Sequence, residues 1–211
     1  MKRDMTQGSE WKLILSFTLP IMATNLLQQF YNTVDGVIVG NFSANSELAL
    51  AAVGTCSGMV MLFLAFAMGL SVGTGVVVAQ YYGAKRFDDL AVAVDTSLLL
   101  LTAFGVIISV LGAALTPLLL THVLRVPDAI FPMAKSYLQI YCVGLVFQFI
   151  YNCAAFILRA IGDSKASLYF LIISTVLNVI LDTLFVVAFH WDVPGVAWAT
   201  VVAQIGCAAA S

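Results

Sequence analysis

The sequence predicts an all-α membrane protein that folds as a bundle of six transmembrane helices. Of its 211 residues, 62% are hydrophobic and 9% are charged, whereas about a quarter of the residues in a soluble domain are charged. A soluble fold could not bury this much apolar surface, so the bilayer must solvate most of the chain. Charged and turn-forming residues divide the sequence into six apolar blocks, which span residues 13–40, 48–80, 91–120, 131–158, 166–189 and 193–211.

Each block is long enough to cross the membrane as a helix. About 20 residues cross the ~30 Å hydrocarbon core, and the longer blocks must tilt, kink or project beyond the bilayer. The first block contains Pro20, which removes a backbone hydrogen bond and is expected to kink the helix, either statically or as a hinge. The second block is rich in glycine, which predicts close packing against neighbouring helices. Its glycines include Gly54, Gly58, Gly69, Gly73 and Gly75.

The distribution of basic residues predicts a cytoplasmic N-terminus, because Lys and Arg are enriched in cytoplasmic loops of membrane proteins. Only Arg125 and Lys135 would lie outside in this orientation. The other basic residues would lie inside; they are Lys2, Arg3, Lys12, Lys85, Arg86, Arg159 and Lys165. No basic patch is present, which argues against nucleic-acid binding. The four scattered cysteines are expected to be free core thiols.

Two aspartates, Asp35 and Asp182, lie inside apolar blocks that contain no Lys or Arg. A carboxylate at membrane depth costs roughly 2.5–3.5 kcal/mol on insertion scales, so such a residue indicates a functional site. With a helix rise of ~1.5 Å per residue, Asp35 lies roughly 7–8 Å from the outer end of its block. Asp182 and Thr200 each lie roughly 10 Å from the outer ends of theirs. Asn178 is one turn deeper than Asp182 on the same helix face. We therefore expect three helices to bring oxygen-bearing side chains to nearly the same height.

Two carboxylates, an amide and a hydroxyl suit a hard monovalent cation such as Na⁺, because oxygen ligands favour hard ions. The same group could bind protons instead, since burial and a second carboxylate both favour the neutral acid. In a purely structural alternative, each aspartate caps or bridges helices without binding an ion. No cofactor is expected.

Several segments of the sequence, taken in their order and spacing, resemble the MATE (multidrug and toxic compound extrusion) family. These segments are LPIMATNLLQQFYNTVDGVIVG, LAAVG, GLSVGTGVVVAQYYGAK, ILRAIGDSK, and NVILD followed by GVAWATVVAQ. The resemblance is to the N-terminal lobe, in the DinF-like branch, and extends over essentially all of residues 1–211. It implies a six-helix lobe equivalent to half of a twelve-helix MATE transporter. The second lobe is absent from this sequence, so the chain is expected to be a fragment or to pair with a C-terminal lobe or a second copy.

The resemblance also implies the roles of individual residues. The site for the coupling Na⁺ or H⁺ matches Asp35, Asn178, Asp182 and Thr200. The family's first-helix proline, whose bending is linked to the state of the aspartate, matches Pro20. The substrate cavity maps to Gln28, Tyr31, Tyr137 and Asn152.

The implied function is cation-coupled antiport that exports drugs or other organic cations by alternating access, in the bacterial cytoplasmic (inner) membrane. The substrate would be a small organic cation or an amphipathic drug. An alternative is a lipid-linked oligosaccharide flippase of the wider superfamily, whose cavity often holds pyrophosphate through arginines. Here Arg125 and Arg159 lie at helix ends, which argues against that alternative. The GxGD pattern of intramembrane aspartyl proteases is absent from the apolar blocks, so the protein is not expected to be an enzyme.

Overall fold

The computed structural model describes residues 10–43 and 45–210, and these ranges contain helices and loops but no strand. This confirms the predicted all-α fold. The α-helices are α1 (Glu10–Phe42), α2 (Ser46–Gly83), α3 (Phe87–Leu118), α4 (Phe131–Ala160), α5 (Ser164–Asp182) and α6 (Asp192–Ala210). Two short π-helical segments, η1 (Leu119–Val123) and η2 (Thr183–Ala188), continue α3 and α5. Lys2 and Arg3, which contribute to the predicted orientation, and Ser211 lie outside the described residues.

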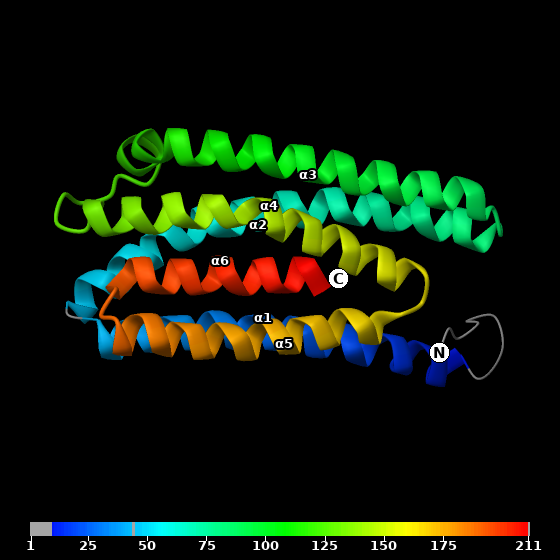
Figure 1. Cartoon of the computed structure of the whole chain (residues 1–211), viewed down its shortest axis with the longest axis horizontal. Coiled ribbons are helices and arrows are strands. Elements are labelled where there is room, and N and C mark those ends of the chain that lie inside the picture. Colours follow the sequence, from blue (N-terminus) through cyan, green and yellow to red (C-terminus); the bar gives the residue numbers. More distant parts are fainter. Residues whose placement is uncertain (1–9, 44, 211) are drawn as a thin grey trace.

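The helices run along one axis and form two groups (Figure 1). Helices α2, α3 and α4 pack together, α1, α5 and α6 pack together, and α4 contacts α6 to join the groups. The C-terminal end of α1, the N-terminal end of α2 and the loops 124–130 and 189–191 lie at one end of the bundle, on the left in Figure 1, which we call the Ser43 end. The loops 84–86 and 161–163 lie at the opposite end, which we call the Arg159 end.

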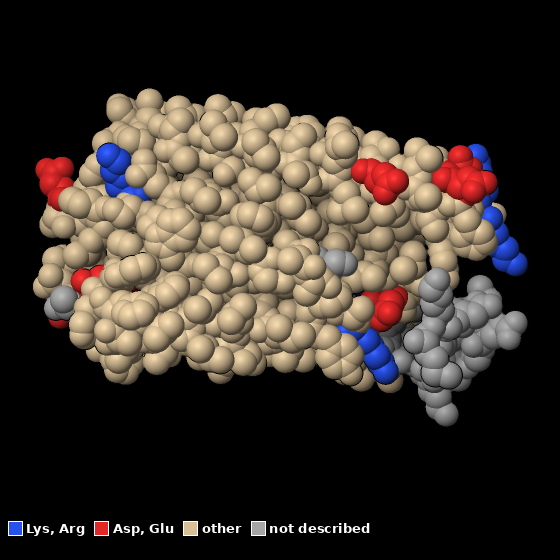
Figure 2. Space-filling view, in the orientation of Figure 1, with Lys and Arg blue, Asp and Glu red and all other residues tan. Residues whose placement is uncertain are grey.

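The surface of the bundle matches a membrane environment. All the helices except α1 are long and apolar enough to cross a bilayer. Helix α1 has 33 residues but carries amide and carboxyl side chains along its length, including Gln28, Asn32 and Asp35. In Figure 2 the charged side chains gather toward the two ends of the molecule and leave the middle of this face without charge.

Helix α4 lies between the two groups and supplies much of the core. Its residues Leu138, Leu145 and Phe149 are fully buried. Ser109 of α3 donates a hydrogen bond to the Cys142 carbonyl of α4 at 2.5 Å. The four cysteines are buried and free, as the sequence predicts. Because α4 contacts both groups, its polar side chains can reach a space between them.

Glycines permit the closest helix approaches, but mostly not the glycines that the sequence singled out. A Cβ added at Gly112 of α3 would lie 2.8 Å from Cys142 Sγ, and one added at Gly144 of α4 would lie 2.9 Å from Val201 Cγ2 of α6. In α2, Gly75 contacts Phe156 of α4. The other α2 glycines face open space among the described residues, so the prediction of close packing was wrong for them; they are Gly54, Gly58, Gly69 and Gly73.

A tight turn joins α4 to α5 at the Arg159 end. Gly162 has φ 89°, a left-handed conformation that glycine adopts at little cost. The Gly162 N–H donates to the Arg159 carbonyl at 3.0 Å, and the Asp163 N–H donates to the Leu158 carbonyl at 2.8 Å. This double closure is the Schellman arrangement that ends many helices. The Asp163 carboxylate then accepts from the Ala166 N–H at 3.1 Å and begins α5.

Candidate functional site

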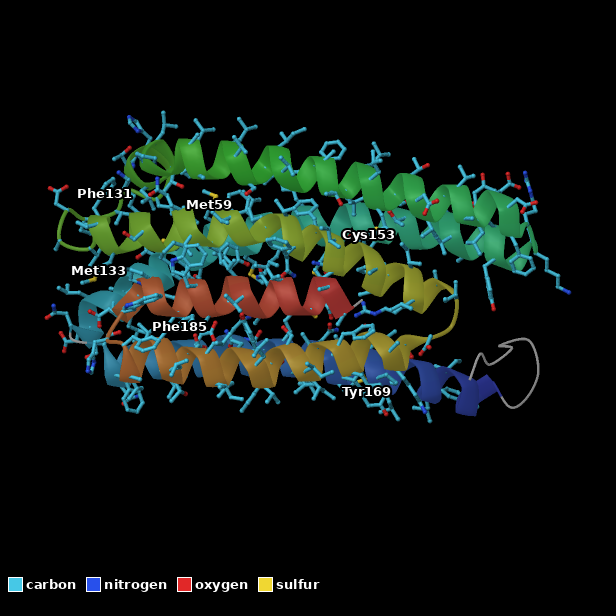
Figure 3. All side chains as sticks on the ribbon, in the orientation of Figure 1. Met59, Phe131, Met133, Cys153, Tyr169 and Phe185 are labelled. Atoms are coloured by element: carbon cyan, nitrogen blue, oxygen red, sulfur yellow. The ribbon has the colours of Figure 1, made fainter. Side chains whose placement is uncertain are left out.

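The structure brings Asp35, Asn178 and Asp182 into contact, and Thr200 lines the same cavity as Asp35. Asp35 comes from α1, Asn178 and Asp182 from α5, and Thr200 from α6. All four side chains are buried, with exposed fractions of 9%, 0%, 0% and 4% respectively. The opposite face of α5 carries apolar and aromatic side chains, and Tyr169 points away from the bundle (Figure 3). Helical periodicity therefore turns the polar stripe of α5 toward α1 and α6.

The Asn178 amide links the two carboxylates. With its nitrogen turned toward them, it donates to Asp35 Oδ1 at 3.0 Å and to Asp182 Oδ2 at 3.1 Å. Asn178 and Asp182 are one helical turn apart, so they occupy the same face of α5. One amide group thus holds carboxylates from two helices at a fixed separation.

The Asn178 bridge holds the two buried carboxyl groups near each other. Ionised carboxylates can only accept hydrogen bonds and repel each other, so this arrangement favours a proton on one group or a cation between them. No Lys or Arg among the described residues forms an ion pair with Asp35 or Asp182. Asp182 Oδ1 is buried and has no hydrogen-bond partner among these residues. The cluster therefore has acceptor oxygens in excess, which is the requirement for binding a cation or a proton.

Tyr31 and Thr200 extend the cluster toward α6. Tyr31 lines the same cavity as Asp35 and Thr200, so its hydroxyl lies near the acidic cluster. Thr200 Oγ1 donates to the Val196 carbonyl at 3.0 Å, which leaves its lone pairs free to accept. The described residues contain no group of three or more His, Cys, Asp or Glu of the kind that holds transition metals.

Asp182 is the last residue of α5, and the π-helical segment η2 begins at the next residue. Such segments are often found at functional sites. Within η2, Phe185 stacks with Phe189 at a ring-centroid distance of 6.2 Å, and its ring centroid lies 5.2 Å from that of Trp191. These ring contacts hold the end of η2 that lies at the Ser43 end of the bundle, and η2 directly follows Asp182. The sequence does not predict η2.

Asp35 and Thr200 line a cavity between the two helix groups. Three of the predicted substrate-cavity residues, Gln28, Tyr31 and Tyr137, also line it. Asn152 does not; it is buried, and its amide donates to the Gln148 carbonyl at 2.8 Å. The remaining lining residues are Asn32, Val60, Leu64, Tyr141, Gln148, Tyr151, Leu171, Ser174, Gln204 and Cys207.

Further polar residues line this cavity wall beside the predicted ones. Tyr141 stacks on Tyr137 with a centroid distance of 6.2 Å, and both rings are buried. Gln148 and Tyr151 follow on α4, and Gln204 lines the cavity from α6. Tyr137, Tyr141, Gln148 and Tyr151 are separated by four, seven and three residues, a spacing that places them on one face of α4.

Pro20 is buried within α1, and the helix continues through it. The Thr24 hydroxyl donates to the Pro20 carbonyl at 2.8 Å, one turn further on. A proline ring removes the backbone hydrogen bond to the carbonyl four residues earlier, and a threonine hydroxyl that bonds back to the i−4 carbonyl often bends a helix, so both residues favour bending of α1 here. Pro20 and Asp35 thus lie on the same helix, about four turns apart.

Comparisons with known proteins identify relatives of this chain. A family model described as MatE matches residues 20–184. "Probable multidrug resistance protein YpnP" of Bacillus subtilis (strain 168) is 35% identical over 201 residues, which is 95% of this chain and 44% of YpnP. The chain thus spans less than half the length of this relative.

Two solved structures show the same helix arrangement. One is described as the outward-facing conformation of a multidrug resistance MATE family transporter of the MOP superfamily. It has a TM-score of 0.86 and 27% identity, with 96% of this chain and 44% of that chain covered. The other is described as an inward-facing conformation of such a transporter, with a TM-score of 0.80, 26% identity and coverage of 87% and 41%. The chain is a multi-pass membrane protein with the fold of one transporter lobe, and it belongs to the MATE family.

Proposed function

We propose that this chain forms the cation-coupled lobe of a secondary-active transporter that exports drugs or other organic cations by alternating access. The relative YpnP carries the name of a multidrug resistance protein, and the similar structures are described as outward-facing and inward-facing conformations of multidrug resistance transporters. A fold that is found in both conformations supports a mechanism with two global states. In that mechanism, a coupling ion and a cargo shift the same equilibrium.

The observation that carries this proposal is the buried pair of carboxylates, one of which, Asp35, lines the cavity. Asp35 and Asp182 share the Asn178 amide and form no ion pair with a Lys or Arg among the described residues. Asp35 and Tyr31 also line the cavity that would hold the cargo. A cation bound by the carboxylates and a cargo bound in the cavity would therefore contact some of the same residues. Binding of each can then change the affinity for the other.

The coupling ion would be Na⁺ or H⁺, bound by Asp35, Asn178, Asp182 and Thr200. The carboxylates and the Thr200 hydroxyl offer the hard oxygen ligands that Na⁺ prefers. A proton on one of the carboxyl groups would instead relieve their mutual repulsion. For Na⁺ to bind between the carboxylates, the proton must leave, so the two ions compete for one site.

Three further features belong to this proposal. The partner is a second lobe of the same fold, either from the same gene product or from a second copy of the chain. The membrane is the bacterial cytoplasmic membrane, with the N-terminus inside. Pro20 acts as the hinge at which α1 bends when the charge at Asp35 changes.

A lipid-linked oligosaccharide flippase is not favoured. The cavity wall, as far as the structure describes it, contains no Lys or Arg that could hold a pyrophosphate. Its polar groups are phenols, amides and a carboxylate, which suit a cargo with a cationic or hydrogen-bonding group.

Substitution of Asp35 tests the proposed function. In cells that express the full-length gene product, Asp35→Asn should abolish resistance to exported drugs because the coupling ion loses one of its two charged ligands. Membrane levels should stay unchanged on immunoblots. Asp95→Asn, a matched change at an exposed aspartate of α3, should retain resistance. Undiminished drug efflux by Asp35→Asn would refute the assignment.

A further inference from the structure

The buried donors at the Arg159 end of the bundle have no role in the cation site. Within the described part of the chain, the buried side-chain atoms without a hydrogen-bond partner include Arg159 Nε and Tyr151 Oη. Buried polar groups in proteins are nearly always paired, so an unpaired donor calls for a physical explanation. Tyr151 is 7% exposed and lines the cavity.

Both donors lie on one stripe of α4. Gln148, Tyr151, Ala155 and Arg159 are separated by steps of three and four residues, so they share a helix face. Long side chains on a helix lean toward its N-terminus, and Arg159 therefore leans back toward Tyr151. The shared stripe and this lean place the Arg159 guanidinium and the Tyr151 ring on the same side of α4.

Helix α5 contributes Ser167 to the surroundings of Arg159. The tight turn at Gly162 brings Ser167 of α5 against the end of α4, where Ser167 is fully buried. Ser167 Oγ accepts a hydrogen bond from Arg159 Nη2 at 3.1 Å. The guanidinium also lies over the Phe156 ring, 5.1 Å from its centroid. Arg159 is thus held in one position by a hydroxyl and a ring, while its Nε stays free.

No negative charge of the described residues balances this guanidinium. The ion pair found in those residues joins Arg86 and Asp89, at an exposed site on another loop. Asp163 is close to Arg159 in sequence, but its carboxylate caps α5 at Ala166. A partly buried charge without a partner is costly and is normally paired with a group of opposite charge. The cluster of Arg159, Tyr151 and Ser167 therefore has a fixed positive charge, and the Arg159 Nε and Tyr151 Oη atoms in it have no hydrogen-bond partner among the described residues.

We propose that Arg159 and Tyr151, with Ser167 beside them, form a binding site for an oxyanion, namely a carboxylate or phosphate group. Arg159 Nε and Tyr151 Oη donate hydrogen bonds to the anion, and the guanidinium supplies the charge. A guanidinium suits both groups because its planar donors match the spacing of their oxygens. The oxyanion comes either from a small molecule in the cavity that Tyr151 lines or from a lipid headgroup at the end of the bundle. A single arginine suits one such group and not the pyrophosphate of a flippase substrate.

Binding measurements on the 211-residue protein test this site independently of transport. Isothermal titration calorimetry measures the binding of free phosphate and free acetate, each added as its choline salt at constant ionic strength. The protein is held in phosphatidylcholine nanodiscs for these titrations. Titration of detergent-solubilised protein with short-chain phosphatidylglycerol, against short-chain phosphatidylcholine, measures the lipid source. We expect saturable binding in at least one arm. Binding of the free anions assigns the site to a soluble ligand, and binding of phosphatidylglycerol alone assigns it to a headgroup; either result supports the oxyanion site.

Variants identify the donors. Arg159→Gln should weaken binding about 10-fold or more, because a charge-assisted hydrogen bond and the charge are both lost. Tyr151→Phe keeps the ring and removes only the hydroxyl, so it should weaken binding about 2- to 10-fold without affecting folding. Arg86→Gln removes the same charge from an exposed loop at the same end and should bind like the wild type. The proposal is overturned if neither the free anions nor phosphatidylglycerol bind saturably, or if Tyr151→Phe and a folded Arg159→Gln both bind like the wild type.

Discussion

The bundle contains two polar clusters that differ in the hydrogen-bond partner they lack. Toward the Ser43 end, Asp35 and Asp182 present more acceptors than the Asn178 amide can satisfy, and Asp182 Oδ1 remains without a partner. Toward the Arg159 end, the unpaired atoms include the donors of Arg159 and Tyr151. The first cluster thus has a buried acceptor without a donor, and the second has buried donors without an acceptor. Under our two proposals, one cluster receives a cation and the other an anion.

The largest effect is expected when a carboxylate is removed from the acidic cluster, because the cluster then loses affinity for its cation. Asp182→Asn should lower the affinity of the acidic cluster for its cation roughly 100-fold or more, equivalent to ~2.7 kcal/mol, because a buried charged ligand is lost. Without cation, the variant should unfold at a higher temperature than the wild type at alkaline pH, since repulsion between two buried carboxylates is relieved. Calorimetric titration and thermal unfolding measure the two effects. Asp95→Asn is the control, and equal losses in both variants would contradict a specific role of Asp182.

The link between the carboxylates can be broken without changing charge. Asn178→Leu should destabilise the protein by ~1–3 kcal/mol, because both carboxylates lose a buried hydrogen-bond donor. Asn25 is an exposed amide on α1, so Asn25→Leu should change the free energy of unfolding little. Chemical unfolding followed by circular dichroism measures both. If the two leucine variants were equally stable, the Asn178 amide would not hold the carboxylates together.

The contact between α4 and α6, which joins the two helix groups, can be tested at Gly144 of α4. In Gly144→Ala, the added Cβ would lie 2.6 Å from Gln204 Oε1 and 2.9 Å from Val201 Cγ2, so the Gln204 and Val201 side chains at the α4–α6 contact must move. We expect a loss of ~1–3 kcal/mol in stability from this overpacking. Gly69→Ala has open space among the described residues and should be neutral or stabilising by up to ~1 kcal/mol, from helix propensity. Thermal unfolding of both variants decides the point, and equal melting temperatures would contradict the close α4–α6 contact.

The smallest effect is expected at Tyr31. Tyr31→Phe keeps the ring in the cavity wall and removes the hydroxyl that lies near the acidic cluster. The loss of one neutral hydrogen-bonding group should weaken cation affinity by only about 2- to 10-fold. A loss as large as that of Asp182→Asn, in the same calorimetric titration, would show that Tyr31 is itself a principal ligand.

The sequence predicts the features that follow from hydropathy and helix periodicity. The all-α membrane fold, the free cysteines and the shared height of Asp35, Asp182 and Thr200 need only composition, topology and helix rise. Which glycines pack closely depends on how the helices rotate toward each other, and periodicity does not determine that rotation. This explains why most of the α2 glycines face open space while Gly112 and Gly144 lie at tight contacts.

The Arg159 cluster and η2 depend on tertiary geometry in the same way. In the sequence, Arg159 is a basic residue at a helix end, where the surroundings would be water and lipid headgroups. Its burial depends on the turn at Gly162, which places Ser167 against its guanidinium. The π-helical segment after Asp182 has no composition signal, because its residues TLFVVA would also suit an α-helix.

The most direct test of the shared site is infrared difference spectroscopy of the carboxylic acid C=O stretch as pH is lowered, with and without Na⁺. If Asp35 and Asp182 hold one proton or cation together, the wild type should show a protonation signal that Asp35→Asn and Asp182→Asn each shift or remove. The Asp95→Asn variant should keep the wild-type signal. Spectra that are identical in the wild type and in both site variants would contradict a joint cation site.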